Sequence, residues 1–160
     1  MKVLGISGSL RSDSHNTALL RNAPVELELW DGLKSIPPYD EDDDVEPAPP
    51  AVARMRATVA GADAILFATP EYNSSVPGQL KNAIDWLSRP RGGAALLNKP
   101  VAVVGASTGA FGAVWAQAEL RKVLATAGAR VVPGELAIGH APRAFDEDGV
   151  LIDQIGRAHV

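Results

Sequence analysis

The sequence predicts an α/β fold in which a parallel sheet of five strands carries helices on both faces. Two observations predict it. Short apolar runs alternate along the chain with segments of 3.6-residue period, and two of the runs, residues 63–68 and 100–107, are apolar almost throughout, as in strands covered on both sides. This alternation implies right-handed crossovers and a parallel sheet. Because 160 residues suit one core, we expect residues 1–160 to form a single domain.

Each expected strand has its own residue pattern. The four clear strands are short apolar runs at residues 2–7, 25–30, 63–68 and 100–107. The second alternates apolar side chains with Glu26 and Glu28, which is typical of a half-exposed edge strand. The last strand, within residues 129–139, is the weakest, because Pro133 and Gly134 interrupt it.

The segments between the strands have helical spacing. Two apolar stripes follow the i, i+3, i+4, i+7 pattern: Leu80, Ala83, Ile84 and Leu87, then Leu120, Val123, Leu124 and Ala127. Pro77 suits the start of the first helix and Gly128 the end of the second. We expect another helix over residues 51–60 and a short one, of barely two turns, after Asn16.

Five strands in a compact chain favour a flavodoxin-like doubly wound sheet of order 2-1-3-4-5, in a three-layer sandwich, over a six-stranded dinucleotide fold. In such a sheet, ligands bind at the carboxyl ends of the strands beside the point where the strand order reverses. Here that point lies between strands one and three. The loops after strands one, three and four are therefore the places to look for a ligand site.

Composition excludes several classes of function. A net charge of -4 argues against a nucleic-acid partner, which needs clustered cations. The chain has no cysteine, which rules out disulfides, iron–sulfur clusters and thiolate chemistry. The N-terminus has no signal-peptide pattern and no run is long enough to span a membrane, so we expect a cytoplasmic protein. The acidic stretch at residues 36–50 is interpreted as a solvated loop, and no metal site is expected there.

The first of the three loops carries side chains suited to binding an anion. They are Ser9, Arg11, Ser14, Asn16 and Thr17, directly after strand one. Arg11 can make paired charge-assisted bonds to a phosphate, and the hydroxyls can complete the shell. The alternative is that Ser14 only caps the helix and Arg11 is solvated. The position of the loop after strand one favours phosphate binding.

The second and third loops offer groups for a flat ligand. Pro70 fixes the second loop, and Glu71, Tyr72 and Asn73 can present backbone N–H groups. The alternatives are that Tyr72 packs on the neighbouring helix and that Asn73 forms an ordinary turn.

In the third loop, Gly109 and Gly112 permit close backbone approach, and Ser107 and Thr108 offer hydroxyls. A tight turn that needs glycine for its geometry alone is the alternative. The three histidines, His15, His140 and His159, are scattered in the sequence and are interpreted as structural or solvated.

Three segments in this order and spacing, GSLRSDSHNT, TPEYNSSVPGQLKNAIDW and STGAFGAVWAQAELRKVL, resemble the NADPH-dependent FMN reductase family. The resemblance implies that the first loop binds the FMN phosphate, that residues 70–73 hold the isoalloxazine ring, and that Ser107, Thr108 and Gly109 close its other edge. It also implies hydride transfer from NADPH or NADH to FMN, then to a quinone, an azo compound, a free flavin or chromate, with ping-pong kinetics.

The chain departs from the family pattern in three places. Ala113 and Trp115 replace a glycine and an arginine of the third motif, the first helix is short, and the chain ends where a closing helix is expected. We therefore expect the final helix to be shortened or missing, with strand five covered by a partner subunit or the domain less stable. With Trp86 and Trp115 near the loops, the resemblance implies a homodimer or homotetramer through the third and fourth helices.

Two other functions are open at this point. A flavodoxin-type electron carrier would bind the same cofactor, although its phosphate loop uses hydroxyls and amides without a cation, so Arg11 favours the reductase. A non-catalytic binding domain without FMN is the second alternative, because fold does not fix function. Direct reduction of the bound flavin by NADPH distinguishes the enzyme from the carrier, and binding of FMN distinguishes both from the binding domain.

Overall fold

A computed structural model describes residues 1–152 as a parallel sheet with helices on both faces. The strand order is β2-β1-β3-β4-β5, and the short β6 pairs with β4 further along the same edge. This is the predicted 2-1-3-4-5 order. The strands are β1 (Val3–Ser7), β2 (Leu27–Trp30), β3 (Ala64–Thr69), β4 (Pro100–Ala106), β5 (Arg130–Val131) and β6 (Ala137–Ile138).

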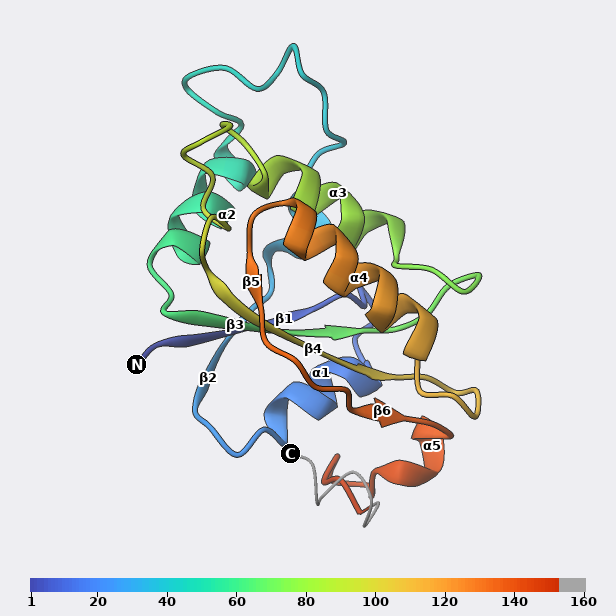
Figure 1. Ribbon diagram of the computed structural model, residues 1–160. Helices are drawn as coiled ribbons and strands as arrows, with labels where there is room; N and C mark the ends of the chain where they lie inside the picture. Colours follow the sequence, from blue (N-terminus) through green and yellow to red (C-terminus); the bar gives the residue numbers. More distant parts are fainter. Residues whose placement is uncertain (153–160) are drawn as a thin grey trace.

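The helices lie in two layers. Figure 1 shows α2, α3 and α4 above the sheet and α1 and α5 below it, which confirms the three-layer sandwich. The helices are α1 (His15–Arg21), α2 (Pro50–Ala60), α3 (Gly78–Leu87), α4 (Val114–Thr126) and α5 (Ala141–Ala144), with a short 3₁₀ helix η1 (Gly32–Ser35) after β2. Within residues 1–152, no helix has the length and apolar character needed to cross a bilayer.

The short and interrupted elements follow the sequence. Helix α1 has 7 residues, the two turns expected. The last strand is divided into β5 and β6 by the segment that contains Pro133 and Gly134, as predicted. After β6 the helix α5, of 4 residues, is the only helix in the described part of the chain. The expected closing helix would fall on residues 153–160, which lie outside the described residues.

The main core lies between the sheet and the α2–α3–α4 layer. The predicted stripe of α3 is buried over its whole length, at Leu80, Ala83, Ile84 and Leu87. A second, smaller cluster joins Leu19 of α1 to Ile138 and Leu151 on the other face. Because both faces are covered, the central strands are the near-continuous apolar runs that parallel sheets require.

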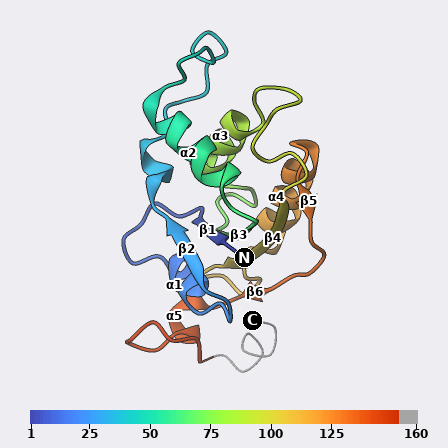
Figure 2. The ribbon, with the colours of Figure 1, turned by 90° about the vertical axis from the view of Figure 1, so that its left-hand side faces the viewer.

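The acidic segment between η1 and α2 extends from the end of the molecule beside these helices (Figure 2). Most of its side chains are exposed, as expected for a solvated loop. Its base is nevertheless fixed: the Arg56 guanidinium pairs with the Asp44 carboxylate at 2.8 Å, and the indole N–H of Trp86 donates to the carbonyl oxygen of Pro37 at 2.9 Å. The loop is therefore tied to α2 and α3.

The strand register places the three predicted loops side by side. Ser7 at the end of β1 pairs with Ala68 of β3, and Ala68 pairs in turn with Val104 of β4. The loops after these strands therefore leave the sheet at nearly the same level, at its carboxyl edge.

Candidate functional site

The three loops meet around one small cavity of about 150 Å³ at the carboxyl edge of the sheet. It is lined by Ser9, Arg11, Ser14, His15, Asn16, Pro70, Glu71, Tyr72, Ala106, Ser107 and Thr108. Nine of these residues are among those the sequence singled out. Of the other three predicted residues, Asn73 and Gly109 lie in the same loops outside the lining, and Thr17 lines a neighbouring cavity.

The first loop brings a cation and two hydroxyls to this cavity. The Arg11 side chain is exposed, and its guanidinium donates to the carbonyl oxygen of Asp13 at 2.5 Å. The Ser14 hydroxyl is buried and accepts a hydrogen bond from the N–H of Thr17 at 3.2 Å, so Ser14 is the N-cap of α1. This bond uses only the oxygen as acceptor, and the hydroxyl hydrogen of Ser14 can still be donated to a ligand.

Asn16 has a structural role that the sequence did not reveal. Its side-chain amide donates to the carbonyl oxygen of Ala106 at 3.0 Å and accepts from the N–H of Ala106 at 2.9 Å. This pair of bonds joins the start of α1 to the end of β4, and it holds the first loop at a fixed distance from the third. Asn16 is 3% exposed, so these bonds satisfy groups that water does not reach.

The side chain of Glu71 is used to begin helix α4. Its carboxylate accepts from the N–H groups of Trp115 and Ala116, each at 3.0 Å. Ala113, the N-cap residue of α4, has no side-chain acceptor of its own, so the second loop supplies one. The carboxylate of Glu71 is therefore held by α4, whereas in the described part of the chain the backbone N–H of Glu71 is free to bind a ligand.

Residues 72–75 form a tight turn. Asn73 and Ser74 have φ of 54° and 59°, the left-handed values that suit asparagine, and Tyr72 and Ser75 exchange backbone hydrogen bonds at 3.1 Å. The prediction that the Tyr72 N–H faces a ligand is wrong, because this N–H donates to Ser75. Within the described residues, the N–H groups of Glu71 and Asn73 donate to no other group and are the remaining donors of this loop.

The third loop is held against the C-terminal segment. The carbonyl oxygen of Gly109 accepts from the N–H of His140 at 2.9 Å, so Gly109 faces α5. Gly112 has φ of 59°, and a Cβ on it would lie 2.4 Å from the carbonyl carbon of Ala137, so glycine is needed here for the geometry of the turn against β6, as in the alternative interpretation. A Cβ on Gly109 would meet only the Ser107 hydroxyl, at 3.8 Å, and close approach of a ligand to Gly109 stays a prediction.

His15 belongs to the site, although its place in the sequence was interpreted as structural or solvated. It lines the cavity, and its ring stacks on Phe145 with centroids 5.9 Å apart and planes 13° apart. Burial, and then the charge of Arg11, lower the pKa of His15 below its usual value. The signal available in the sequence was its position between Ser14 and Asn16.

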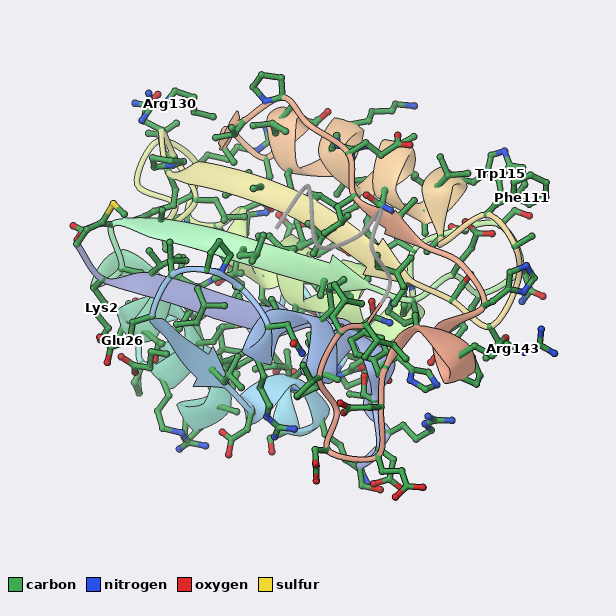
Figure 3. The ribbon with its side chains drawn as sticks, turned by 90° about the horizontal axis from the view of Figure 1, so that it is seen from below. Lys2, Glu26, Phe111, Trp115, Arg130 and Arg143 are labelled. Atoms are coloured by element: carbon green, nitrogen blue, oxygen red, sulfur yellow. The ribbon has the colours of Figure 1, made fainter. Side chains whose placement is uncertain are left out.

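Exposed aromatic side chains lie at the carboxyl end of the sheet. Phe111 and Trp115 are 65% and 49% exposed, pack edge to face with ring centroids 5.1 Å apart, and project from this end in Figure 3. Tyr72 is also exposed, so the alternative interpretation, in which its side chain packs on the neighbouring helix, is not observed. The interface role expected of Trp86 is wrong, because that side chain is fully buried.

In this doubly wound sheet, the loops at the switch point combine a cation, hydroxyls and free backbone N–H groups. This arrangement is typical of proteins that bind a mononucleotide. Within that class, the profile of the NADPH-dependent FMN reductases matches residues 1–143. The chain is 47% identical to the NAD(P)H-dependent FMN reductase of Pseudomonas aeruginosa, over 98% of this chain and 88% of that protein. It is 42% identical to a quinone reductase of Pseudomonas putida, over 93% and 83% of the two chains.

Among solved structures, the flavoenzyme FerB of Paracoccus denitrificans, an NAD(P)H:(acceptor) oxidoreductase, superimposes with a TM-score of 0.85 at 37% identity, over 98% of this chain and 89% of that one. The chain thus belongs to the NADPH-dependent FMN reductase family. It is an oxidoreductase with FMN as its cofactor and a reduced nicotinamide nucleotide as its hydride donor. This decides against the electron carrier and the cofactor-free binding domain.

Proposed function

We propose that this FMN-dependent enzyme reduces quinones with hydride from NADPH. The observation that carries the proposal is the meeting of three loops around one cavity, with Arg11 from the first loop and Tyr72 from the second. Two relatives support the choice of acceptor, since one is named quinone reductase and another, from Burkholderia, 2-hydroxy-1,4-benzoquinone reductase. Azo compounds, free flavins and chromate are the acceptors to compare with a quinone.

The donor set at one end of the cavity fits the FMN phosphate. Arg11 would bind the phosphate through charge-assisted hydrogen bonds, and the hydroxyls of Ser9 and Ser14 would donate to its other oxygens. Asn16 and Thr17 would support this end through the backbone of α1, because the Asn16 amide is occupied by Ala106. We assign these five residues to the phosphate end of the cofactor.

The other two loops fit the ring. Pro70, Glu71, Tyr72 and Asn73 would hold one edge, with the N–H groups of Glu71 and Asn73 as donors, and Ser107, Thr108 and Gly109 would close the opposite edge. When bound, FMN supplies the hydride chemistry. The N–H groups of Glu71 and Asn73, whose positions the turn fixes, would then donate to the edge of the ring and stabilise negative charge there.

The test is an absorbance spectrum of the purified protein under anaerobic conditions, before and after NADPH. We expect a flavin spectrum that NADPH bleaches and that a benzoquinone then restores. Parallel assays with an azo dye, free FMN and chromate rank the acceptors by kcat/KM. A flavin that NADPH bleaches, combined with a quinone that ranks below the other acceptors, would contradict the choice of quinone and leave the reductase assignment in place.

We further propose that the whole chain works as one FMN-binding domain in a homodimer or a dimer of dimers. The exposed aromatic pair Phe111 and Trp115, at the start of α4, supports an interface that includes this helix and its neighbour α3. Sedimentation at micromolar concentration should give a dimer or tetramer that Trp115→Arg weakens. A wild-type monomer would contradict the proposal. We place the enzyme in the cytoplasm, where reduced nicotinamide nucleotides are regenerated.

A further inference from the structure

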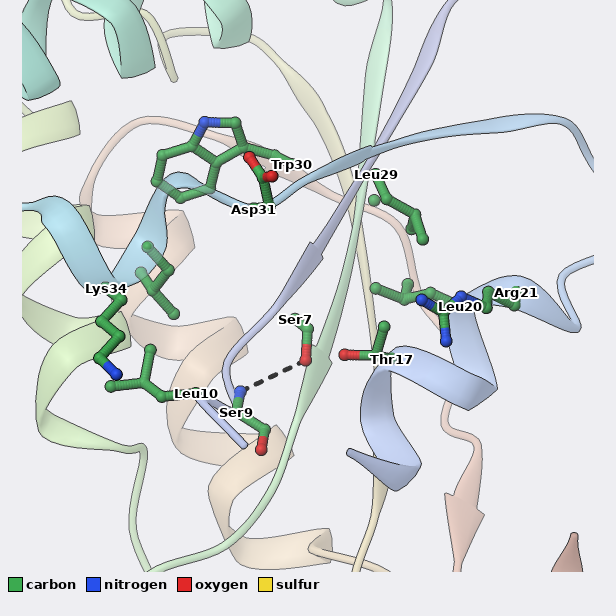
Figure 4. A pocket seen from close by; sticks show the side chains of 12 residues that line it. Ser7, Ser9, Leu10, Thr17, Leu20, Arg21, Leu29, Trp30, Asp31 and Lys34 are labelled. Atoms are coloured by element: carbon green, nitrogen blue, oxygen red, sulfur yellow. Dashed lines mark hydrogen bonds between the residues drawn. The ribbon is translucent and has the colours of Figure 1, made fainter. Parts of the chain in front are cut away.

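A second cavity lies at the carboxyl ends of β1 and β2, and it has about 270 Å³ of space (Figure 4). Its lining is contributed by β1, the first loop, α1, β2 and η1: Gly5, Ser7, Ser9, Leu10, Thr17, Leu20, Arg21, Leu29, Trp30, Asp31, Leu33 and Lys34. Ser9 lines both cavities, so the second cavity is the immediate neighbour of the proposed phosphate site.

The lining combines an apolar wall with cations. Leucines and the Trp30 ring form the wall, and the hydroxyls of Ser7 and Thr17 lie side by side in Figure 4, where the Ser7 oxygen accepts from the N–H of Ser9. In the part of the lining that residues 1–152 contribute, Arg21 and Lys34 are opposed by one carboxylate, Asp31, which leaves one net positive charge there in a chain of net charge -4. Within residues 1–152, neither Arg21 nor Lys34 is paired with a carboxylate.

These two features indicate the chemistry of a ligand. An aromatic and aliphatic wall fits a flat heterocycle, and exposed cations from two different elements fit a phosphate group. The volume is just below the range of about 300–1,000 Å³ usual for small-molecule pockets, so the cavity takes one end of a dinucleotide and not the whole of it. A phosphorylated adenosine has both required parts.

We propose that this cavity binds the adenosine end of the hydride donor, with one of its two cations on the 2′-phosphate: Arg21 or Lys34, which lie on opposite sides of the cavity in Figure 4. The inference rests on the proposed use of NADPH, and it gives that preference a structural cause: NADH lacks the 2′-phosphate and leaves that cation without a partner. The nicotinamide end would then reach the first cavity, which Ser9 joins to the second. A free adenosine nucleotide is the other source of the same chemistry.

The binding test uses the FMN-loaded protein and isothermal titration calorimetry, so that it does not depend on turnover. Adenosine 2′,5′-bisphosphate represents the donor's adenosine end, and adenosine 5′-monophosphate represents a free nucleotide without the 2′-phosphate. We expect the bisphosphate to bind more tightly, and the double variant Arg21→Ala/Lys34→Ala to weaken it about tenfold or more, as expected for lost bonds to a charged group. Arg54→Ala, an exposed arginine of α2 that lines neither cavity, is the matched control.

The kinetic test compares the two donors. In the double variant the ratio of KM for NADPH to KM for NADH should rise about tenfold, because only NADPH has the 2′-phosphate. If NADPH still bleaches the flavin but the double variant keeps wild-type KM and bisphosphate affinity, the inference is overturned and the proposed function stands. Equal binding of the monophosphate and the bisphosphate also overturns it. If NADPH does not bleach the wild-type flavin, the donor proposal fails, and the calorimetry alone decides whether the cavity binds this nucleotide.

Discussion

Asn16 shows how one side chain can position a site without touching a ligand. Its amide makes two hydrogen bonds to the backbone of Ala106, and these connect the first loop to the third across the sheet edge. Groups that bind a cofactor must be held in place by neighbours whose own conformation is fixed. At the switch point of this sheet, a polar residue that the sequence suggested as a ligand contact supplies that support.

Replacement of Asn16 by leucine should therefore destabilise the protein. The N–H and carbonyl groups of Ala106 would lose their partners while still buried, at a cost of about 1–3 kcal/mol each. We expect the free energy of unfolding, measured by urea denaturation, to fall by roughly 2–6 kcal/mol. Asn16→Asp keeps an acceptor for the Ala106 N–H and should lie between wild type and leucine. Equal stability of the three proteins would refute this role.

Arg11 is the residue on which phosphate affinity should depend most. Among residues 1–152, its guanidinium is the one permanent cation in the lining of the first cavity. Arg11→Ala should weaken FMN binding by about 1.5–3 kcal/mol, roughly 10- to 150-fold, the scale of hydrogen bonds to a charged group. Fluorescence titration of the apoprotein with FMN measures the affinity, with Arg54→Ala as control. Unchanged affinity for FMN would remove the phosphate role from Arg11.

The protonation of His15 should make stability depend on pH on the acid side. Its pKa in the folded protein is below the ordinary value of about 6.5, because burial disfavours the charged ring and Arg11 repels it. The unfolded chain then binds the proton more readily, so the free energy of unfolding falls as the pH decreases from about 7 through the folded pKa. His15→Phe keeps the stack on Phe145 and should reduce this fall in urea denaturation from pH 7.5 to about 5. An unchanged pH profile would argue against the assignment.

At the scale of elements, the second loop and α4 hold each other at two points. Glu71 accepts from the first N–H groups of α4, and Glu119 of α4 accepts from the Ser75 hydroxyl at 2.6 Å and the Val76 N–H at 3.3 Å. These two donors lower the pKa of Glu119. Each element thus supplies the acceptor that the other lacks, and the turn at residues 72–75 is fixed relative to the helix behind it.

The contact between the third loop and β6 gives a prediction at the same scale. Gly112 and Gly149 both have positive φ, 59° and 77°, but only Gly112 has backbone atoms where a Cβ would lie. Gly149→Ala should cost about 1–2 kcal/mol of stability for the left-handed conformation alone. Gly112→Ala should cost roughly 2–5 kcal/mol, because overpacking against Ala137 is added. Thermal unfolding followed by circular dichroism compares the two variants. Equal losses of stability would show that the backbone at Ala137 moves to accommodate the Cβ without a further cost.

Sequence patterns predicted the elements better than the contacts between them. The stripe of α3 and the break at Pro133 and Gly134 are local signals, and both were correct. Trp86 was misjudged because it lies off that stripe: it is buried by the segment before α2, where Tyr39 packs on its ring with centroids 4.9 Å apart. The roles of Glu71 and His15 likewise depend on partners more than 40 residues away, α4 and Phe145, which no local pattern contains.

At the scale of the whole molecule, the site lies where separately held parts converge. The first loop is tied to β4 through Asn16, the second to α4 through Glu71, and the third to β6 and α5 through Gly109 and Gly112. Within residues 1–152, the α1 side of the sheet is covered by two short helices, α1 with 7 residues and α5 with 4, and by the small cluster around Ile138 and Leu151. A ligand that contacts all three loops would therefore connect the thinner layer to the main core.

Cofactor binding should for this reason stabilise the whole fold. A ligand that binds only the folded state adds RT ln(1 + [L]/Kd), about 2.7 kcal/mol at a hundredfold excess over Kd. For a chain of this size that corresponds to an increase in Tm of roughly 5–11 °C. Riboflavin, which lacks the phosphate, should raise Tm less at the same concentration, because it cannot use Arg11 and the serines. In the Arg11→Ala variant the difference between the two flavins should become smaller, because only the serines remain to bind the phosphate, as judged by circular dichroism melts of the apoprotein. A full shift with riboflavin in the wild type would place the binding energy in the ring loops and leave the first loop with the structural tasks of Ser14 and Asn16 alone.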